Sequence, residues 1–320
     1  MYNKLDRIDR GILEILDENA RTSFTQIAHL LGISKQLVSF RLKRLESRKI
    51  IDQYSAYLDR SRLGYYHYQL YLKLPKDLEN ESLVKSLSKI PSIHWVAQSN
   101  GTYNLIVYFL VKNLEECYLT YNTITKTFTG LIKEKQFLLT TRAHYFNQGL
   151  ITYAQKKAGI LQQPTKIHKL KPRDYSLINA IKENARKEIK QLARQVGLSE
   201  YTTRQRLNYL IKIRVIREFK PRLNYQALGY NHYQIFICFN ESSSLEKQII
   251  LKKIISSKEF LRVTEVIGKW DLTCDVILPN GKNPSLWFKK LVGTKLLESL
   301  NSTDILELKR VPALNTVVYS

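Results

Sequence analysis

The chain contains an internal repeat, and this repeat constrains the fold more than any other feature. Leu5 aligns with Leu170, and the register then holds without a gap to Gln69 opposite Gln234. Identical stretches include Asn-Ala-Arg at 19–21 and 184–186 and Leu-Gly-Tyr at 63–65 and 228–230. The period is far longer than that of a solenoid. We therefore expect two duplicated units, each large enough to bury its own core.

The first part of each copy has the periodicity of helices. In copy one, an apolar stripe at spacings of three and four residues consists of Leu5, Ile8, Ile12, Leu13 and Leu16. Ser23 and Gln26 predict a capping box for a second helix, which Gly32 ends. Ser34 predicts the cap of a third helix that carries Val38, Leu42 and Leu45. Copy two repeats this pattern over residues 170–214.

The second part of each copy has the composition of strands. In copy one, strands are predicted at 66–74, 103–111 and 133–146, with helix-like stretches at 80–90 and 114–128. Copy two has matching segments at 232–239, 244–255, 260–268, 271–278, 284–300 and 304–311. This β-α-β-β-α-β order is typical of a ferredoxin-like domain.

The stretch between the copies, residues 153–172, is polar and basic and contains two prolines, so we interpret 153–169 as a linker. Pro172 suits the first turn of the following helix. The expected fold class is α+β, with two winged helix-turn-helix domains and two ferredoxin-like domains in tandem. Their expected bounds are 1–62, 63–152, 170–226 and 227–320.

The net charge indicates a polyanionic partner. Lys and Arg number 51 and Asp and Glu 28, which gives a net charge of +23. Double-stranded DNA is the first candidate. An anionic membrane is the second, but it requires a basic amphipathic helix or a lipid anchor, and neither is found. The longest apolar run, 105–111, is far shorter than the roughly 20 residues that span a bilayer. The residues MYNKLDRIDR do not form a signal peptide, so we expect a cytoplasmic protein.

The remaining residue types predict no catalytic chemistry. Cys117, Cys238 and Cys274 lie far apart in apolar runs, which favours buried thiols over a disulfide or a metal site. No nucleophile–base pair, metal-ligand spacing or phosphate-binding glycine loop stands out, and no cofactor is expected. His67 and His232 recur at matched positions inside a Tyr-rich strand, which favours hydrogen-bonded packing.

The second and third helices of each copy, joined by a Gly-x-Ser turn, predict a helix-turn-helix, whose second helix enters the DNA major groove. In copy one we expect Gln36 to pair with adenine, Phe40 to contact a thymine methyl, and Lys43 to contact guanine or phosphate. Ser39 shares this outward face, and Lys35, Arg41 and Arg44 suit phosphate contacts. The expected DNA-binding residues of copy two are Glu200, Tyr201, Arg204, Gln205, Arg206 and Asn208.

A plain amphipathic helix with a solvated basic face is the alternative interpretation of each such helix. Two copies at identical spacing favour the helix-turn-helix. Each copy also continues into a short turn and strand-like segments, at 50–59 and 215–224, that can form a wing.

These motifs resemble the Lrp/AsnC (leucine-responsive, feast–famine) family of transcriptional regulators. The residues that carry the resemblance are L-D-x-x-D at 5–9, N-A-R at 19–21, L-G-I-S at 31–34, R-L-x-x-L at 41–45 and I-I-x-x-Y-x-A-x-L-D at 50–59. The family's G-x-Y/W-D/N-L turn is matched by 101–105 and 268–272. The resemblance covers nearly the whole chain, twice, and it implies a sensor role for the ferredoxin-like domains.

The resemblance further implies that sensor domains self-associate sheet to sheet and bind a small effector, often an amino acid, near that turn. The implied effector-binding residues are Gly101, Tyr103, Asn104, Gly268, Trp270 and Asp271. Asn104 departs from the family's Asp, so copy one is expected to bind no effector or a different one. A purely structural turn at Gly101 and Gly268 is the alternative. Pairing of the two sensor domains within one chain, or between chains, both stay open.

The two copies differ where they are expected to read DNA. Residues 1–62 hold 12 basic and 8 acidic side chains, net +4, whereas residues 166–222 hold 16 and 5, net +11. The outward positions 36, 39, 40 and 43 correspond to 201, 204, 205 and 208, and all four pairs differ. We therefore predict that the second head supplies more of the affinity for phosphates. We also predict that the operator is asymmetric.

Two other functions are alternatives to DNA-binding regulation. Sirohaem decarboxylases resemble this family, also occur as fused halves, and use His and Arg around the sensor turn to hold tetrapyrrole carboxylates. Here His94 and Arg262 are present, but no His or Arg directly precedes the turn. RNA binding is disfavoured because exposed aromatic pairs on a sheet are missing from the reading heads.

Overall fold

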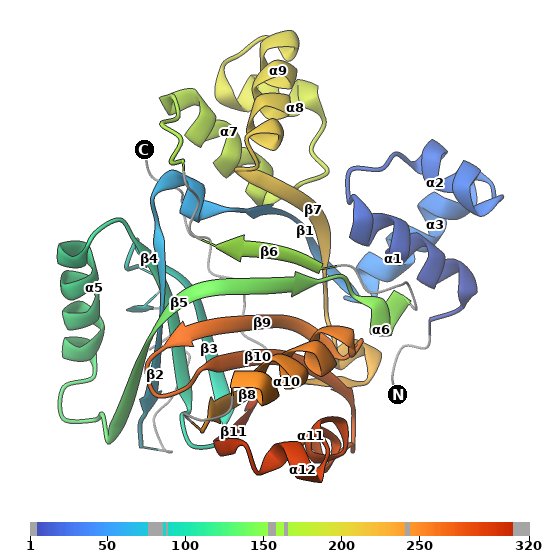
Figure 1. The fold of residues 1–320 in the computed structure, drawn as a ribbon. Helices are drawn as coiled ribbons and strands as arrows, with labels where there is room; N and C mark the ends of the chain where they lie inside the picture. The colour runs from blue at the N-terminus through green and yellow to red at the C-terminus, as the bar shows by residue number, and fades with distance from the viewer. Residues whose placement is uncertain are drawn as a thin grey trace.

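A computed structural model describes residues 5–75, 86–87, 89–152, 158–162, 166–240 and 244–309. Figure 1 shows two small helical lobes set on a large body of strands, with further helices on the outside of that body. No helix in these ranges has the length and apolarity that crossing a membrane requires.

Each helical lobe contains the three helices that the sequence predicts. The first lobe comprises α1 (Arg7–Glu18), α2 (Phe24–Leu31) and α3 (Lys35–Ser47), and the second comprises α7 (Pro172–Glu183), α8 (Ile189–Val196) and α9 (Glu200–Lys212). The Ser23–Gln26 capping box is present, Gly32 ends α2 with φ +63°, and the hydroxyl of Ser34 accepts from the amide of Leu37. The predicted start and stop signals are thus confirmed.

The strand that follows each lobe pairs with its counterpart from the other copy. β1 (Ile51–Leu58) and β7 (Ile216–Leu223) form a two-stranded antiparallel sheet of their own. The segments expected to form a wing therefore build one shared ribbon. The 3-10 turns η1 (Arg60–Leu63) and η2 (Gln226–Leu228) lead from these strands into the body.

The body confirms the ferredoxin-like order in copy two, and in copy one it confirms the strands and the second helix of that order. Copy one contributes β2 (Tyr66–Lys73), β3 (Ile93–Asn100), β4 (Leu105–Val111), α5 (Leu114–Thr127) and β5 (Glu134–Phe146). Copy two contributes β8 (Tyr230–Phe239), α10 (Ser244–Ser256), β9 (Phe260–Ile267), β10 (Leu272–Pro279), α11 (Pro284–Val292), α12 (Thr294–Leu297) and β11 (Leu300–Leu308). Most of the helix expected at 80–90 lies outside the described residues.

The two sensor sheets close into one ring of eight strands. The hydrogen-bonded order is β2-β4-β3-β11-β8-β10-β9-β5, and β5 pairs again with β2. The sheets join at two seams, where β11 meets β3 and β5 meets β9. The sensor domains therefore pair within one chain, which is the pseudo-dimer that the sequence left as one of two possibilities.

The helices cover the outside of the ring (Figure 1). An apolar cluster fills the inside. α5 packs its Cys117 and Ile124 on the sheet of copy one. α10 and α11 pack on the sheet of copy two. The interior is built largely from aromatic side chains, including Tyr71, Tyr103, Phe236 and Trp270. Burial of large rings from both copies stabilises the closed ring.

The predicted linker is more structured than its composition indicates. β6 (Ala158–Gln162), within this segment, adds a ninth strand to the sheet beside β5, and α6 (Gly149–Thr152), which precedes the segment, contacts α1. Ile160 pairs with His144, and Leu161 with Ala143. The part of the predicted linker at 158–162 therefore forms a strand, because β5 extends past the ring and offers it a free edge.

Candidate nucleic-acid interface and internal cavity

The expected reading faces of α3 and α9 point away from the protein core. Residues on this face that are exposed are Gln36, Phe40, Lys43, Tyr201, Arg204, Gln205 and Asn208. Ser39 is half-buried, and Lys35 and Glu200 are exposed at the N-terminal ends of the two helices. Phe40 and Tyr201 are 61% and 70% exposed. Both helices therefore present accessible side chains that differ in kind.

Arg41 and Arg44 do not point outward. The guanidinium of Arg41 pairs with Asp6, and that of Arg44 lies 2.6 Å from the carboxylate of Asp9. Asp9 is buried, and its hydrogen bonding with Asp6 closes the capping box of α1. The hydrogen bond that Arg41 donates to Asp6 raises the pKa of Arg41, against the effect of burial. We correct the expectation of phosphate contacts, because both side chains fasten α3 to α1.

Arg206 has the same structural role in copy two. Its Nε donates to Oδ1 of Asp174 at 2.6 Å, and a second nitrogen pairs with the other carboxylate oxygen. Asp174 has no solvent exposure. The bidentate pair raises the pKa of Arg206. Its expected DNA contact is corrected for the same reason.

The two lobes are interlocked through the repeated Asn-Ala-Arg triplet. Arg21 donates to the carbonyl oxygens of Ala185 and Lys187 at 2.5 and 3.1 Å. Arg186 donates to the carbonyl oxygen of Ala20 at 2.5 Å. This exchange across a local two-fold relation, together with the β1–β7 ribbon, fixes one lobe against the other.

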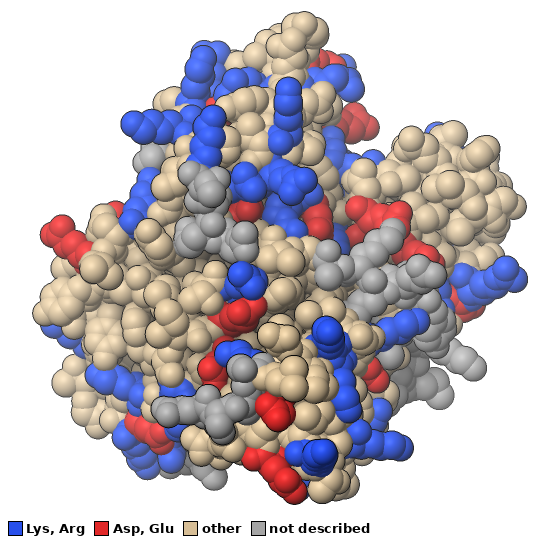
Figure 2. Space-filling view, in the orientation of Figure 1, with Lys and Arg blue, Asp and Glu red and all other residues tan. Residues whose placement is uncertain are grey.

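Positive charge is distributed unevenly between the lobes. On the face shown in Figure 2, Lys and Arg gather over α7–α9 and the adjoining ribbon, whereas α1–α3 present mainly uncharged atoms. This view agrees with net charges of +4 for residues 1–62 and +11 for residues 166–222.

The glycines of the two sensor turns lie at the seams of the ring. A Cβ on Gly101 would approach Cδ2 of Leu306 to 2.5 Å, and a Cβ on Gly268 would approach the carbonyl oxygen of Phe137 to 2.9 Å. Their φ angles are +146° and +150°. Each glycine therefore lets its turn approach a strand of the opposite copy closely, which agrees with the interpretation of a purely structural turn.

The other four turn residues are committed to packing. Tyr103 and Trp270 are buried inside the ring. The side chain of Asn104 exchanges two hydrogen bonds with the backbone of Leu74. The carboxylate of Asp271 accepts from the amide of Phe239 at 2.8 Å. Effector binding by these six turn residues stays a prediction, and none of the six lines either of two cavities that lie between the β1–β7 ribbon and the ring.

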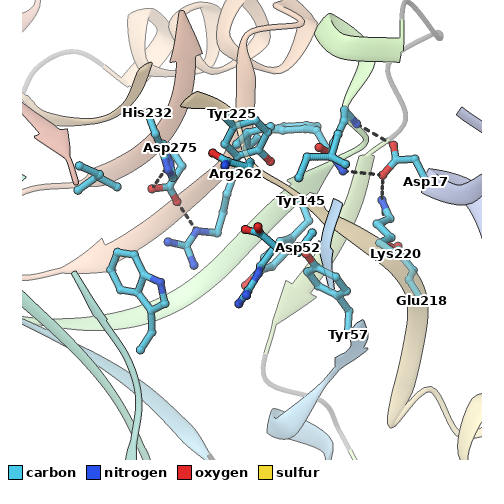
Figure 3. Close-up of a pocket in the computed structure, with 18 of the residues that line it drawn as sticks. Asp17, Asp52, Tyr57, Tyr145, Glu218, Lys220, Tyr225, His232, Arg262 and Asp275 are labelled. Carbon is cyan, nitrogen blue, oxygen red and sulfur yellow. Dashed lines mark hydrogen bonds and ion pairs between the residues drawn. The ribbon is translucent and has the colours of Figure 1, made fainter. Parts of the chain in front are cut away.

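A cavity of about 880 Å³ lies between the ribbon and one end of the ring (Figure 3). The ribbon side contributes Tyr57, Glu218 and Lys220, and the ring side contributes Tyr145 and Arg262. Asp17, at the end of α1, also lines it. Because the wall combines elements of the heads and of the sensor ring, an occupant would touch both.

The charged wall of this cavity centres on Asp275. Nε of Arg262 donates to its Oδ2 at 2.5 Å, and Nε2 of His232 lies 3.5 Å from Oδ1. Burial acts to raise the pKa of Asp275, but Arg262 and His232 hold it below its ordinary value. His232 was expected to be hydrogen-bonded, yet its buried Nε2 has no hydrogen-bond partner among the described residues.

Aromatic side chains adjoin this charged wall. The rings of Trp95 and Tyr108 are 4.6 Å apart between centroids, and the guanidinium carbon of Arg262 lies 5.3 Å from the centroid of Tyr108. The hydroxyl of Tyr108 accepts from the side chain of Gln234 at 2.6 Å. These residues come from both copies, so only ring closure assembles the site.

A smaller cavity of about 350 Å³ adjoins the first and shares His94 and Arg262 with it. His67 stacks on His94 with 4.9 Å between ring centroids, and its Nδ1 lies 2.6 Å from the hydroxyl of Thr140. This confirms hydrogen-bonded packing for His67. Burial, assisted by Arg262 and Arg60, lowers the pKa of His67 to about 3, so the ring is neutral.

Comparison with known proteins agrees with the duplicated architecture. A family model described as winged helix-turn-helix DNA-binding matches residues 5–52 and again 170–217. The transcriptional regulator Ptr1 of Methanocaldococcus jannaschii is 37% identical over 114 residues, which are 35% of this chain and 75% of the relative. The regulator LrpA of Pyrococcus abyssi is 33% identical over 115 residues, 35% of this chain and 79% of the relative.

Among solved structures, the sirohaem decarboxylase NirDL has a similar fold across almost the whole chain. The TM-score is 0.62 at 13% identity, covering 95% of this chain and 91% of NirDL. At this identity the likeness concerns the fold alone. The sequence relatives and the two matched motifs carry the assignment: the chain belongs to the Lrp/AsnC family of helix-turn-helix transcriptional regulators and carries the family's unit twice.

Proposed function

We propose that this protein is a sequence-specific transcriptional regulator that reads double-stranded DNA with two non-identical heads. The observation that carries the proposal is the pairing of the lobes through the β1–β7 ribbon, with unlike accessible faces on α3 and α9. A dimer with identical heads reads a palindrome. Two different heads, held in one chain, read an asymmetric site.

The reading roles are assigned by side-chain chemistry. On α3, Gln36 pairs with adenine, Phe40 packs on a thymine methyl, and Lys43 contacts guanine or phosphate. On α9, Arg204 is the candidate for bidentate recognition of guanine, and Gln205 or Asn208 for adenine. Phosphate contacts come from the exposed ends of the helices, in place of the Arg residues bound to Asp9 and Asp174.

Selection from random DNA with the intact chain tests this function. Each of Lys43→Ala and Arg204→Ala should relax the motif in one half-site only, at a cost of about 1–3 kcal/mol for a lost base contact. Lys289→Ala, an exposed change on α11 far from the lobes in Figure 1, is the matched control. A perfect palindrome bound by a single chain would contradict the proposal, and uniform weakening would reassign both residues to phosphate.

A sirohaem-decarboxylase-like activity is the second candidate. It is favoured by the fold shared with NirDL and by a cavity of about 880 Å³ that contains His94 and Arg262. Against it, four carboxylates, those of Asp17, Asp52, Glu218 and Asp275, line the same cavity and would repel the acid groups of a tetrapyrrole. A change in the Soret band of sirohaem on adding the protein, followed by loss of carbon dioxide from the tetrapyrrole, would establish this activity.

A further inference from the structure

Equivalent positions of the two copies contribute unlike side chains to the large cavity. β9 (Phe260–Ile267) corresponds to β3 (Ile93–Asn100), so Arg262 occupies the position of Trp95. β10 corresponds to β4 in the same register, so Asp275 occupies the position of Tyr108. All four residues line the cavity. One copy therefore supplies an ion pair and the other supplies two aromatic rings to the same space.

Arg262 has hydrogen-bonding capacity that the protein leaves unused. Within the described part of the chain, its side-chain hydrogen bonding is confined to Nε, which donates to Asp275. Figure 3 shows the guanidinium extending from β9 into the open space between the ring and the ribbon. The two terminal nitrogens of a guanidinium form a planar fork that matches one carboxylate.

Aromatic side chains surround this fork. The guanidinium carbon of Arg262 lies 5.3 Å from the centroid of Tyr108 and 6.0 Å from that of Tyr145. Trp95 is half-buried, lines the cavity and contacts Tyr108. A carboxylate bound to Arg262 would therefore place whatever it carries against ring faces, which favour a planar aromatic group.

The charges of the wall favour a ligand of small negative charge. Six cationic side chains and four carboxylates line the cavity, a surplus of two positive charges. Asp17 and Glu218 already pair with Lys220, and Asp275 pairs with Arg262. A single anion is attracted, but a polyanion would place its further charges beside these carboxylates.

We propose that this cavity is an effector site for a planar aromatic monocarboxylate. The carboxylate binds the terminal nitrogens of Arg262, and the ring packs among Trp95, Tyr108 and Tyr145.

The position of the cavity gives this ligand a route to the DNA-binding lobes. Tyr57 of β1 and Arg217 and Lys220 of β7 line the side opposite Arg262. These strands form the ribbon that joins the lobes. A ligand held between ring and ribbon changes the freedom of the ribbon, so ligand and operator affinities are coupled reciprocally. This regulatory step rests on the proposed DNA-binding function, whereas ligand binding does not.

Calorimetric titration of the full chain without DNA tests binding. The probe is phenylacetate, compared with phenylacetamide, which lacks the charge, and cyclohexylacetate, which lacks the aromatic ring. We expect phenylacetate to bind at least about tenfold more tightly than either analogue, the ratio that about 1.4 kcal/mol produces. Equal affinity for phenylacetate and phenylacetamide, or no heat with any probe, overturns the proposal.

Two variants locate the site. Arg262→Lys keeps a cation beside buried Asp275 but removes the fork, so it should fold and weaken phenylacetate binding about tenfold. Trp95→Leu should weaken phenylacetate and leave cyclohexylacetate unchanged. Arg194→Lys, the same chemical change at an exposed position on α8, is the matched control. Unchanged binding in Arg262→Lys overturns the assignment.

DNA binding supplies the second readout. Saturating phenylacetate should change operator affinity about fivefold or more, within the usual range of allosteric coupling. No change refutes the regulatory step. Loss of DNA binding with phenylacetate binding intact would refute only the proposed function. Displacement of phenylacetate by an iron tetrapyrrole, with a Soret shift, would overturn the monocarboxylate assignment and support the second candidate.

Discussion

A methyl group at Gly268 should open the ring of strands at the seam between the copies. The Cβ of Gly268→Ala would lie 2.9 Å from the carbonyl oxygen of Phe137 and still closer to Cδ2 of Leu138, both on β5. The backbone of β5 cannot withdraw without breaking its pairing with β9. Replacing this glycine therefore adds steric overlap to a backbone conformation, φ +150°, that L residues rarely adopt.

The magnitude follows from these two costs. An alanine held at such a φ costs about 1–3 kcal/mol, and an overpacked methyl about 1–3 kcal/mol more. Gly101→Ala has the same backbone cost at the other seam, but its nearest carbonyl oxygen, that of Ile305, is 3.3 Å away. It should therefore destabilise less than Gly268→Ala. Gly197→Ala, with φ +65° and open space around the new methyl, is the control and should cost only about 1–2 kcal/mol.

Urea unfolding followed by tryptophan fluorescence measures these costs, because Trp270 lies inside the ring. The free energy of unfolding should be highest for the wild type and should decrease from Gly197→Ala to Gly101→Ala and then to Gly268→Ala. If Gly268→Ala were as stable as Gly197→Ala, the close contact of β5 with the turn would be refuted. The role of this turn in closing the ring would then be refuted as well.

The free energy of unfolding should decrease on acidification from about pH 6.5 toward about pH 3. Folding lowers the pKa of His67 to about 3, so between these pH values only the unfolded chain gains the proton. The loss amounts to at most about 1.4 kcal/mol per pH unit. Thermal unfolding of His67→Gln should show a flatter pH dependence, whereas His29→Gln, at an exposed site, should match wild type. Arg206→Gln should cost about 3–5 kcal/mol by leaving buried Asp174 unpaired, whereas exposed Arg204→Gln should stay within about 0.5 kcal/mol; equal losses in denaturation would contradict this. Operator affinity measured by fluorescence anisotropy should fall by about 10³–10⁵ between roughly 50 and 200 mM salt, and a flat salt response would exclude phosphate-dominated binding.

The sequence by itself determined most of the elements and their order, although β3 and β6 were not predicted. The gapless repeat, the capping signals at Ser23 and Ser34, and the alternation of helix and strand periods each depend on contacts within a few residues, or on identity between distant ones. The same local rules indicated which side of α3 and α9 faces outward. The DNA-reading candidates such as Phe40 and Arg204 are accessible for that reason.

Predictions from local patterns were wrong where a side chain has a partner far away in the sequence. Arg41 and Arg206 belong to basic helices, and only the folded lobe shows them bound to acids on α1 and α7. Gly101 and Gly268 match a motif associated with effectors, yet they serve contacts with the opposite copy. Neither partner is recognisable from spacing, because ion pairs and steric contacts depend on distance in space.

Only the tertiary structure decided how the two copies combine. The sequence left pairing within the chain and between chains equally open, and neither periodicity nor charge distinguishes them. Closure of the ring at the β3–β11 and β5–β9 seams brings Trp95 and Arg262 into one cavity, although these two residues are 167 positions apart in the sequence. The repeat determined that there are two units. The aromatic surface that both copies bury together joins these units into one molecule.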